Sequence, residues 1–343
     1  MLWAFEKALK AFIWRYLEVF MAKELSTQAK WKPWKGVLLF VIVIAWMFVG
    51  SIAGGLIDNA TVGTLILQLG FLAIAIIATL INKTPLKEVF PLKKITVRDF
   101  FGTILMWMGA LPLGLLSALI MGKLFPQTYA EVASSVSSVA SGTGVVILGF
   151  ITAVICPPIC EEAIMRGAIF SNFRAIKKDW VIVLIIGIFF GIFHMDYIRF
   201  FNTAILGGCM AYLMCKRNNF ILPAIFHFIN NFVTIGISLI SAMFSQPATQ
   251  EAAENASQID ANAVTEIAST VIPGLMIASF LCPIILIIGA HLIKRQHEIS
   301  EGKEPSGMKL GAKIGLAAIP SVLLLLCGII LISKSLSNIT ITM

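Results

Sequence analysis

The sequence predicts an all-α membrane protein, a polytopic bundle of about 8 to 9 transmembrane helices with a cytoplasmic N-terminus. Three observations support this fold class. Hydrophobic residues make up 58% of the 343 residues, charged residues only 13%, and the mean hydropathy is +0.92. Apolar stretches long enough to cross a bilayer recur along the chain, while the alternating pattern of barrel strands is absent. Lys and Arg gather in alternate connecting segments.

These stretches predict nine spans, several of them short or interrupted by Gly or Pro. They lie near residues 37–57, 62–82, 100–122, 144–171, 180–195, 200–215, 220–244, 270–293 and 314–333. We divide the chain into an N-terminal segment (1–35), N-terminal transmembrane helices (36–143), a core (144–244), an external loop (245–269) and C-terminal transmembrane helices (270–343).

The N-terminal segment, residues 1–35, is predicted to stay on the mature protein. Charged residues interrupt it from Glu6 to Glu24, and no cleavage site follows an uncharged run, so it is not a secretory signal. Its apolar residues recur at helical spacing, and Trp31 and Trp34 alternate with lysines. We expect either an amphipathic helix on the membrane surface or a cytoplasmic helix that covers the bundle.

The basic residues set the orientation. With the N-terminus inside, all but four of the 26 Lys and Arg fall in cytoplasmic segments, the exceptions being Lys123, Arg166, Arg199 and Lys334. This is the positive-inside pattern of a multi-pass protein, and we expect it in the plasma membrane. The net charge of +8 thus reflects topology and contact with the lipid bilayer, and no nucleic acid partner is predicted.

The predicted external loop, 245–269, has no Lys or Arg. It carries Glu251, Glu254, Asp260 and Glu266 among small and polar residues. We expect a solvated acidic segment, with helix as an alternative to loop.

Two adjacent glutamates and an arginine lie inside the fourth predicted span. An ionisable side chain at membrane depth is costly unless it is paired or hydrated, and it therefore marks a candidate functional site. Glu162 and Arg166 are four residues apart, on one face of a helix, and can pair. Glu161 is rotated by about 100° from Glu162 and needs another partner. Pro157 and Pro158, directly upstream, predict a helix break, with the glutamates in the first turns of a new helix.

Two histidines and an amide extend this set. His194 and His227 lie in apolar segments, and Asn231 follows His227 by four residues on the same helical face. A glutamate with a histidine can act as general base on water, while His227 and Asn231 form an oxyanion hole. Alternatively, Glu161, His194 and His227 supply the His2Glu ligands of a catalytic zinc site. Both arrangements predict a hydrolase.

Depth in the membrane separates these groups if the spans are straight. Counted from the cytoplasmic edge at the helical rise, Glu161 and His227 lie about 10 to 15 Å deep and His194 about 20 Å deep. Helix tilt, or an earlier start of the fifth span, is needed to bring them to one water molecule.

At these residues the sequence resembles the CAAX-processing and bacteriocin-processing intramembrane proteases, the CPBP or Abi family, which includes the type II CAAX prenyl endopeptidases. The family pattern is EExxxR, FxxxH and HxxxN, in that order. All three motifs are intact over roughly residues 144–240, as Glu161-Glu162-x-x-x-Arg166, Phe190-x-x-x-His194 and His227-x-x-x-Asn231.

The resemblance implies peptide-bond hydrolysis at or within the membrane, on a peptide or protein substrate. In that mechanism Glu161 activates water with His194, His227 and Asn231 stabilise the oxyanion, and Glu162 and Arg166 position the others. The family includes proteins described as metalloproteases and as metal-independent glutamate proteases, so a zinc ion held by Glu161, His194 and His227 stays open. Prenyl specificity is not carried over.

Two other functions fit the same residues. Buried Glu and His chains also build the relays of proton- or solute-coupled transporters, and the same fold can serve as a non-catalytic membrane scaffold. The glycine pairs Gly54-Gly55 and Gly207-Gly208 predict close helix contacts within the chain, and the oligomeric state stays open.

Overall fold

The computed structural model describes residues 32–57, 59–132, 146–236, 261–304 and 306–341, and no strand occurs among them. The helices in chain order are α2 (Pro33–Gly55), α3 (Ala60–Ile81), α4 (Leu86–Val89), α5 (Val97–Leu124), α7 (Val146–Phe150), α8 (Cys156–Glu162), α9 (Asp179–Phe193), α10 (Tyr197–Arg217), α11 (Ile221–Asn231), α14 (Ala261–Ala278), α15 (Cys282–Ser300) and α16 (Leu310–Ile341). Three π-helical segments, η1 (Ile151–Ile155), η2 (Ala163–Ile169) and η3 (Phe232–Gly236), adjoin α8 and α11.

Seven helical stretches of the described residues are long and apolar enough to cross a membrane, and α9 and the α11–η3 helix are shorter apolar ones. The protein is an integral membrane protein of all-helical fold, as the sequence predicts. Most predicted spans match an observed helix to within a few residues. Parts of three predicted segments lie outside the described residues: 1–31 of the N-terminal segment, 237–244 of the seventh span and 245–260 of the external loop.

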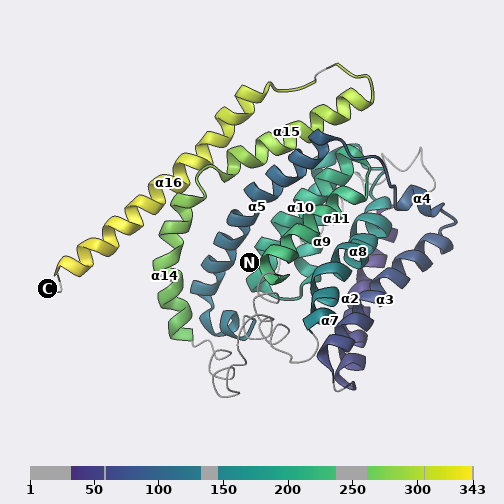
Figure 1. Cartoon of the computed structure of the whole chain (residues 1–343), viewed down its shortest axis with the longest axis horizontal. Helices are drawn as coiled ribbons and strands as arrows, with labels where there is room; N and C mark the ends of the chain where they lie inside the picture. The colour runs from purple at the N-terminus through teal and green to yellow at the C-terminus, as the bar shows by residue number, and fades with distance from the viewer. Residues whose placement is uncertain (1–31, 58, 133–145, 237–260, 305, 342–343) are drawn as a thin grey trace, which may run out of the picture.

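The prediction of one span over 270–293 is wrong. Helix α14 begins at Ala261, within the segment predicted as a loop, and ends at Ala278, while α15 begins at Cys282. The change of direction follows from Pro283 in the first turn of α15, because proline fits the start of a helix and not its interior. The two helices take different directions in Figure 1.

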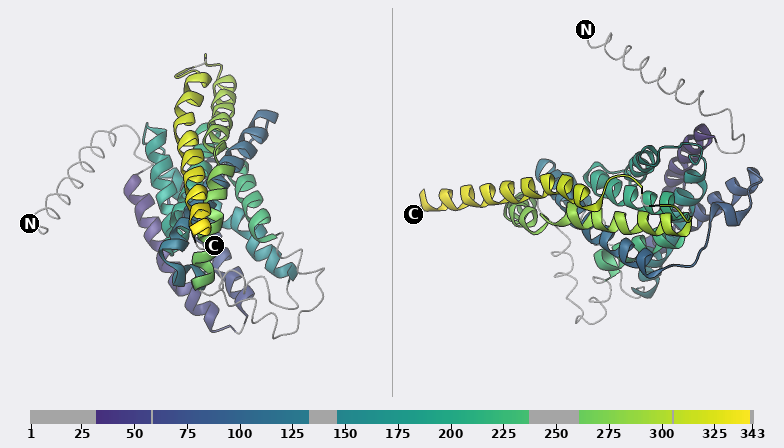
Figure 2. Two further views of the ribbon diagram at one scale, coloured as in Figure 1. Left: turned by 90° about the vertical axis from the view of Figure 1, so that its left-hand side faces the viewer. Right: turned by 90° about the horizontal axis from the view of Figure 1, so that it is seen from above.

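Helix α5 is central to the arrangement of the bundle (Figure 1). It packs against α10, α14 and α15, while α9 and α10 form an antiparallel pair beside it. Helices α2 and α3 pair with each other and pack against the α8–η2 rod. Helix α16 contacts α14 and α15 at the periphery, and its C-terminal part extends beyond the other helices in Figure 1 and in the right-hand view of Figure 2.

The rod from α7 through η1 and α8 to η2 is continuous, so the helix break predicted at Pro157 and Pro158 does not occur. The backbone keeps right-handed helical angles at Phe150, Cys156 and Ala163, where the segments meet. Because proline has no N–H, Pro157 and Pro158 cannot donate hydrogen bonds to the backbone carbonyls of the preceding turn. The segment before them, η1, has the wider π-helical hydrogen bonding, which accommodates the two prolines without a break. The glutamates that follow are therefore fixed in a rigid, buried rod.

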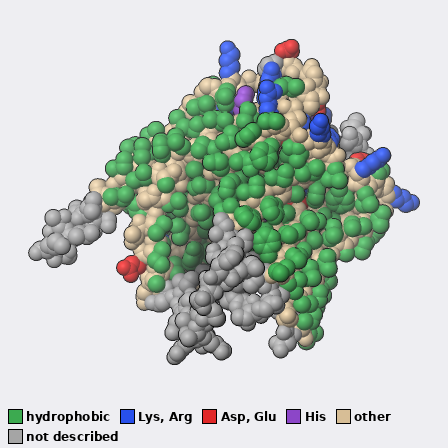
Figure 3. All heavy atoms as spheres, viewed as in Figure 1, with side chains coloured by type: hydrophobic (Ala, Val, Ile, Leu, Met, Phe, Trp, Pro, Cys, Tyr) green, Lys and Arg blue, Asp and Glu red, His purple; other side chains and the backbone are tan. Residues whose placement is uncertain are grey.

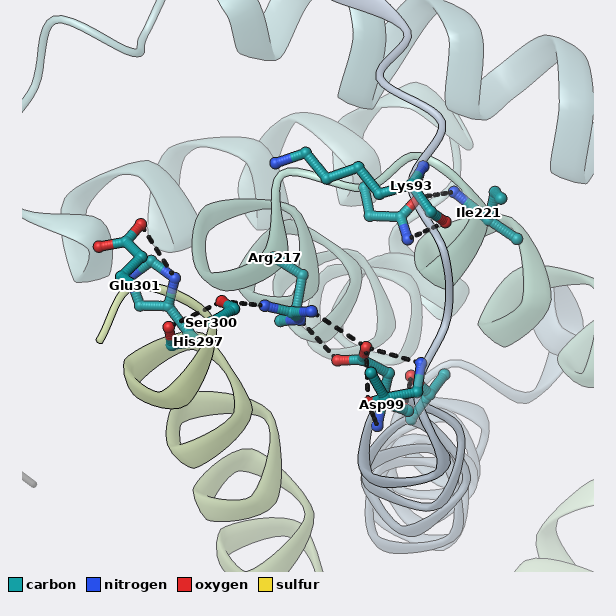
Figure 4. Close-up of polar contacts among 10 residues, drawn as sticks. Lys93, Asp99, Arg217, Ile221, His297, Ser300 and Glu301 are labelled. Atoms are coloured by element: carbon teal, nitrogen blue, oxygen red, sulfur yellow. Dashed lines mark hydrogen bonds and ion pairs between the residues drawn. The ribbon is translucent and has the colours of Figure 1, made fainter. Parts of the chain in front are cut away.

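One end of the bundle is basic. Figure 3 shows Lys and Arg side chains along its upper edge and hydrophobic side chains over the flank below. At this end the buried Asp99 of α5 forms two bonds with Arg217 at the end of α10, of 2.6 and 3.1 Å, and Arg217 also donates to Ser300 of α15 (Figure 4). This end is the one that the positive-inside rule assigns to the cytoplasm.

Candidate active site

A buried ion pair forms the base of the site. Arg166, in η2, donates from Nη1 to Oε1 of Glu162 at 2.9 Å, and neither side chain is exposed at all. The other guanidinium nitrogen, Nη2, donates to the backbone carbonyl of Gly207 in α10 at 2.9 Å. The guanidinium also lies 4.3 Å from the ring centroid of Phe190 in α9. The predicted Glu162–Arg166 pairing is confirmed, and it ties three helices together.

The small size of Gly207 allows α10 to lie this close to α9 and to Arg166. A Cβ atom at position 207 would lie 2.6 Å from the Cβ of Phe190, closer than real carbon atoms come. The close helix contact predicted at this glycine pair is therefore present, between α9 and α10, and it lies directly beside the arginine.

His227, in α11, lies between the two glutamates. Its Nδ1 is 2.9 Å from Oε1 of Glu162, and because an ionised carboxylate only accepts, Nδ1 carries the hydrogen. Its Nε2 is 3.9 Å from Oε2 of Glu161. The bond to Glu162 thus fixes the ring so that Nε2 is turned toward the second glutamate.

Glu161 has a partner that the sequence analysis missed. Gln68, from the middle of α3, donates from Nε2 to Oε1 of Glu161 at 2.7 Å. Both side chains are more than nine-tenths buried. In the sequence, Gln68 is recognisable only as a single amide in an otherwise apolar span. Polar residues in membrane helices often bond to a neighbouring helix, but the sequence does not show to which residue.

His194 lies at the C-terminal end of α9, one turn beyond Phe190. Its Nδ1 donates to the carbonyl of Phe190 at 2.8 Å, which leaves Nε2 as the acceptor of the neutral ring. The Phe190 ring packs edge-on against both imidazoles, at 4.9 Å from His194 and 5.8 Å from His227. Both imidazoles thus contact one phenyl ring, and no hydrogen bond joins His194 to Glu161 among the described residues.

The amide of Asn231 is bonded to the backbone of η1. Its Nδ2 donates to the backbone carbonyl of Ala153 in η1 at 3.1 Å, and its Oδ1 accepts from Asn230. One of its two amide hydrogens is thus used within the fold, and no contact with Glu161 occurs among the described residues. The structure brings Glu161, Glu162, Arg166 and His227 together, with His194 close by and Asn231 one helical turn away.

The residues as placed do not fit a three-ligand metal centre. Among the described residues, no three His, Cys, Asp or Glu side chains converge as metal ligands would. Of the three expected ligands, His227 and His194 each have Nδ1 bonded to the protein, and the remaining His227 nitrogen lies 3.9 Å from the Glu161 oxygen. This spacing leaves room for a water molecule between the two atoms, and each imidazole keeps its Nε2 free of the protein.

The charges of the site leave one acid without a counter-ion. Arg166 balances Glu162, whereas Glu161 has only an uncharged amide donor and the imidazole of His227. A buried carboxylate beside an imidazole can exchange a proton with water, which is the requirement for general base catalysis.

A family model described as type II CAAX prenyl endopeptidase Rce1-like matches residues 143–233. The matched segment contains the α8–η2 rod, α9, α10 and α11, and so every motif residue of the site. The resemblance predicted from the three motifs is confirmed by this match. No curated protein and no solved structure matches the chain.

Proposed function

We propose, from the family match over residues 143–233, that the protein is an intramembrane endopeptidase in which Glu161 activates water. The family supports a protease-type enzyme acting at the membrane. The observation that carries the proposal is the position of Glu161: a buried carboxylate without a counter-ion, 3.9 Å from an imidazole whose other nitrogen is fixed by a second glutamate.

The proposed reaction begins with a water molecule beside Oε2 of Glu161. The carboxylate takes a proton as the water oxygen attacks the scissile carbonyl carbon. The oxyanion is stabilised by Nε2–H of His227 in its protonated form, since the Nδ1 hydrogen is already bonded to Glu162, and by the unused amide hydrogen of Asn231 one helical turn away. As the C–N bond breaks, Glu161 returns the proton to the leaving amine.

The neighbouring residues hold these groups in place. Glu162 orients His227, and Arg166 pairs with Glu162 while anchoring it to α10. His194 keeps a free Nε2 acceptor beside the Phe190 ring that also contacts His227. Such positioning by a second layer of bonds is what keeps catalytic atoms within the range that efficient proton transfer needs.

We favour a metal-independent reaction, because no three His, Cys, Asp or Glu side chains of the described residues converge as metal ligands would. The proposed substrate is a peptide or lipidated protein in or at the membrane. The proposed location is the plasma membrane, with the site open toward the cytoplasm.

The test uses the purified protein in liposomes with two C-terminal peptides of the same sequence, one farnesylated and one not. We expect cleavage of at least one peptide, persisting in excess EDTA, and its loss in Glu161→Gln. The matched control is Glu266→Gln, an exposed glutamate of α14, which keeps the wild-type rate. Equal rates in Glu161→Gln and wild type would refute the role of Glu161. Solute flux without proteolysis would favour a transporter.

A further inference from the structure

Among the hydrogen bonds of the described residues, the one from Gln68 to Glu161 alone joins α3 to the acidic pair. The amide of Gln68 is 5% exposed and lies within 2.7 Å of Glu161, which itself is 8% exposed. A hydrogen bond from an amide to a buried carboxylate is charge-assisted, and it is stronger than a bond between neutral groups.

The contact fixes which way the amide faces. A carboxylate offers only acceptors, so the NH2 group of Gln68, and not its carbonyl oxygen, faces Oε1 of Glu161. That carbonyl oxygen, Oε1, is buried and has no hydrogen-bond partner among the described residues. A buried acceptor without a donor is costly, so Oε1 is a candidate to accept a hydrogen bond from a bound molecule.

The same contact distinguishes the two oxygens of Glu161. Oε1 is taken by Gln68, while Oε2 faces Nε2 of His227 at 3.9 Å. Because the donor occupies one oxygen, the free basic oxygen is Oε2, on the side of the imidazole.

We propose that Gln68 is part of the catalytic site and that its Oε1 accepts a hydrogen bond from the attacking water. This inference rests on the proposed function above. A water molecule has two hydrogens, and two acceptors, Oε2 of Glu161 and Oε1 of Gln68, bind both. Its lone pair is then directed away from the protein, toward the scissile carbonyl.

The step balances without any change in Gln68. The water oxygen forms the bond to the carbonyl carbon and passes one proton to Oε2 of Glu161. Its second hydrogen stays on the new hydroxyl group, still bonded to Gln68. Glu161 then gives its proton to the amine nitrogen as the C–N bond breaks.

The variant that tests this is Gln68→Met, which keeps the length of the side chain and removes both hydrogen-bonding groups. Loss of a hydrogen bond to a charged group lowers a rate constant by about 10- to 100-fold. We expect a decrease of this size in kcat, with KM changed less than about twofold. The acidic limb of the pH profile of kcat/KM should also move to higher pH, because the ionised carboxylate has lost a donor. A merely structural role of Gln68 would not move that limb.

The matched control is Thr79→Val, on the same helix. Thr79 is also buried, but its hydroxyl donates only to the carbonyl of Ala75. We expect wild-type kcat and an unchanged pH profile. A larger KM with unchanged kcat in Gln68→Met would overturn the inference, since it would assign Oε1 to a substrate N–H instead of water.

A readout without turnover separates this inference from the proposed function. In pH-difference infrared spectra of the purified protein, the Glu161 band is identified by its loss in Glu161→Gln. It should shift in Gln68→Met and not in Thr79→Val. An unshifted band in Gln68→Met contradicts the inference whether or not a peptide is cleaved, whereas failure of the proposed function appears as cleavage that survives Glu161→Gln.

Discussion

The buried ion pair predicts an asymmetric cost of mutation. In Glu162→Leu the guanidinium of Arg166, with no exposure, keeps only the carbonyl of Gly207 and the face of Phe190. Neither contact neutralises the charge, so we expect a loss of about 3–5 kcal/mol in the free energy of unfolding. In Arg166→Met the Glu162 carboxylate keeps the Nδ1–H of His227, and a protonated imidazole can balance it. We expect about 1–3 kcal/mol there.

The double variant removes both charges at once. Its cost should fall below the sum of the single costs by about 2 kcal/mol or more, because no charge is left uncompensated in the bundle. The assay is reversible unfolding in mixed micelles, followed by circular dichroism as denaturing detergent is titrated. Arg199→Met is the control, because its pair with Asp196 is partly exposed and is expected to contribute about 0.2–1 kcal/mol. If the free-energy costs of the two single variants simply add, or if Glu162→Leu is as stable as Arg199→Met, then breaking the Glu162–Arg166 pair does not leave an uncompensated charge, and the reasoning is refuted.

Gly207→Val should destabilise the protein by about 1–3 kcal/mol, because a Cβ there lies 2.6 Å from that of Phe190. Gly208→Ala, whose Cβ would have its nearest neighbour at 3.6 Å, should melt like wild type in a detergent thermal scan, and equal melting of both variants would contradict the packing. At the basic end, hydrogen bonds from Ser306 lower the pKa of Glu298 from 4.5 to about 2. Their contribution to stability is therefore full above pH 4.5 and is lost as the pH falls toward 2. Carbon-13 NMR titration of Glu298 should give a higher pKa in Ser306→Ala than in wild type, and the same value in both would argue against this cause.

The helical fold followed directly from the sequence because each span carries its own signal, a long apolar run with charge at its ends. The three motifs also identified Glu162 and Arg166 as a pair, since their spacing of four residues fixes their contact within one helix. Local spacing carries no such information about other helices. For this reason the partner of Glu161 in α3, 93 residues away, was missed.

Three further differences concern the backbone. Two adjacent prolines predict a helix break if only α-helical hydrogen bonding is considered. In the structure the π-helical segment η1 precedes them, and the rod continues without a break. The stretch near Pro283 is uniformly apolar, so hydropathy merges α14 and α15 into one span although the chain turns there. The contact of Asn231 with Ala153 depends on that π-helical register and is invisible in the spacing of His227 and Asn231.

Peptide cleavage in oxygen-18 water is the most direct test of attack by a water molecule activated by Glu161. The wild-type protein in liposomes should release a product whose new carboxyl group carries one oxygen-18 atom, detected by mass spectrometry, and Glu161→Gln should release none above background. Labelled product formed by Glu161→Gln at the wild-type rate would contradict the account, because water would then be activated without the carboxylate of Glu161.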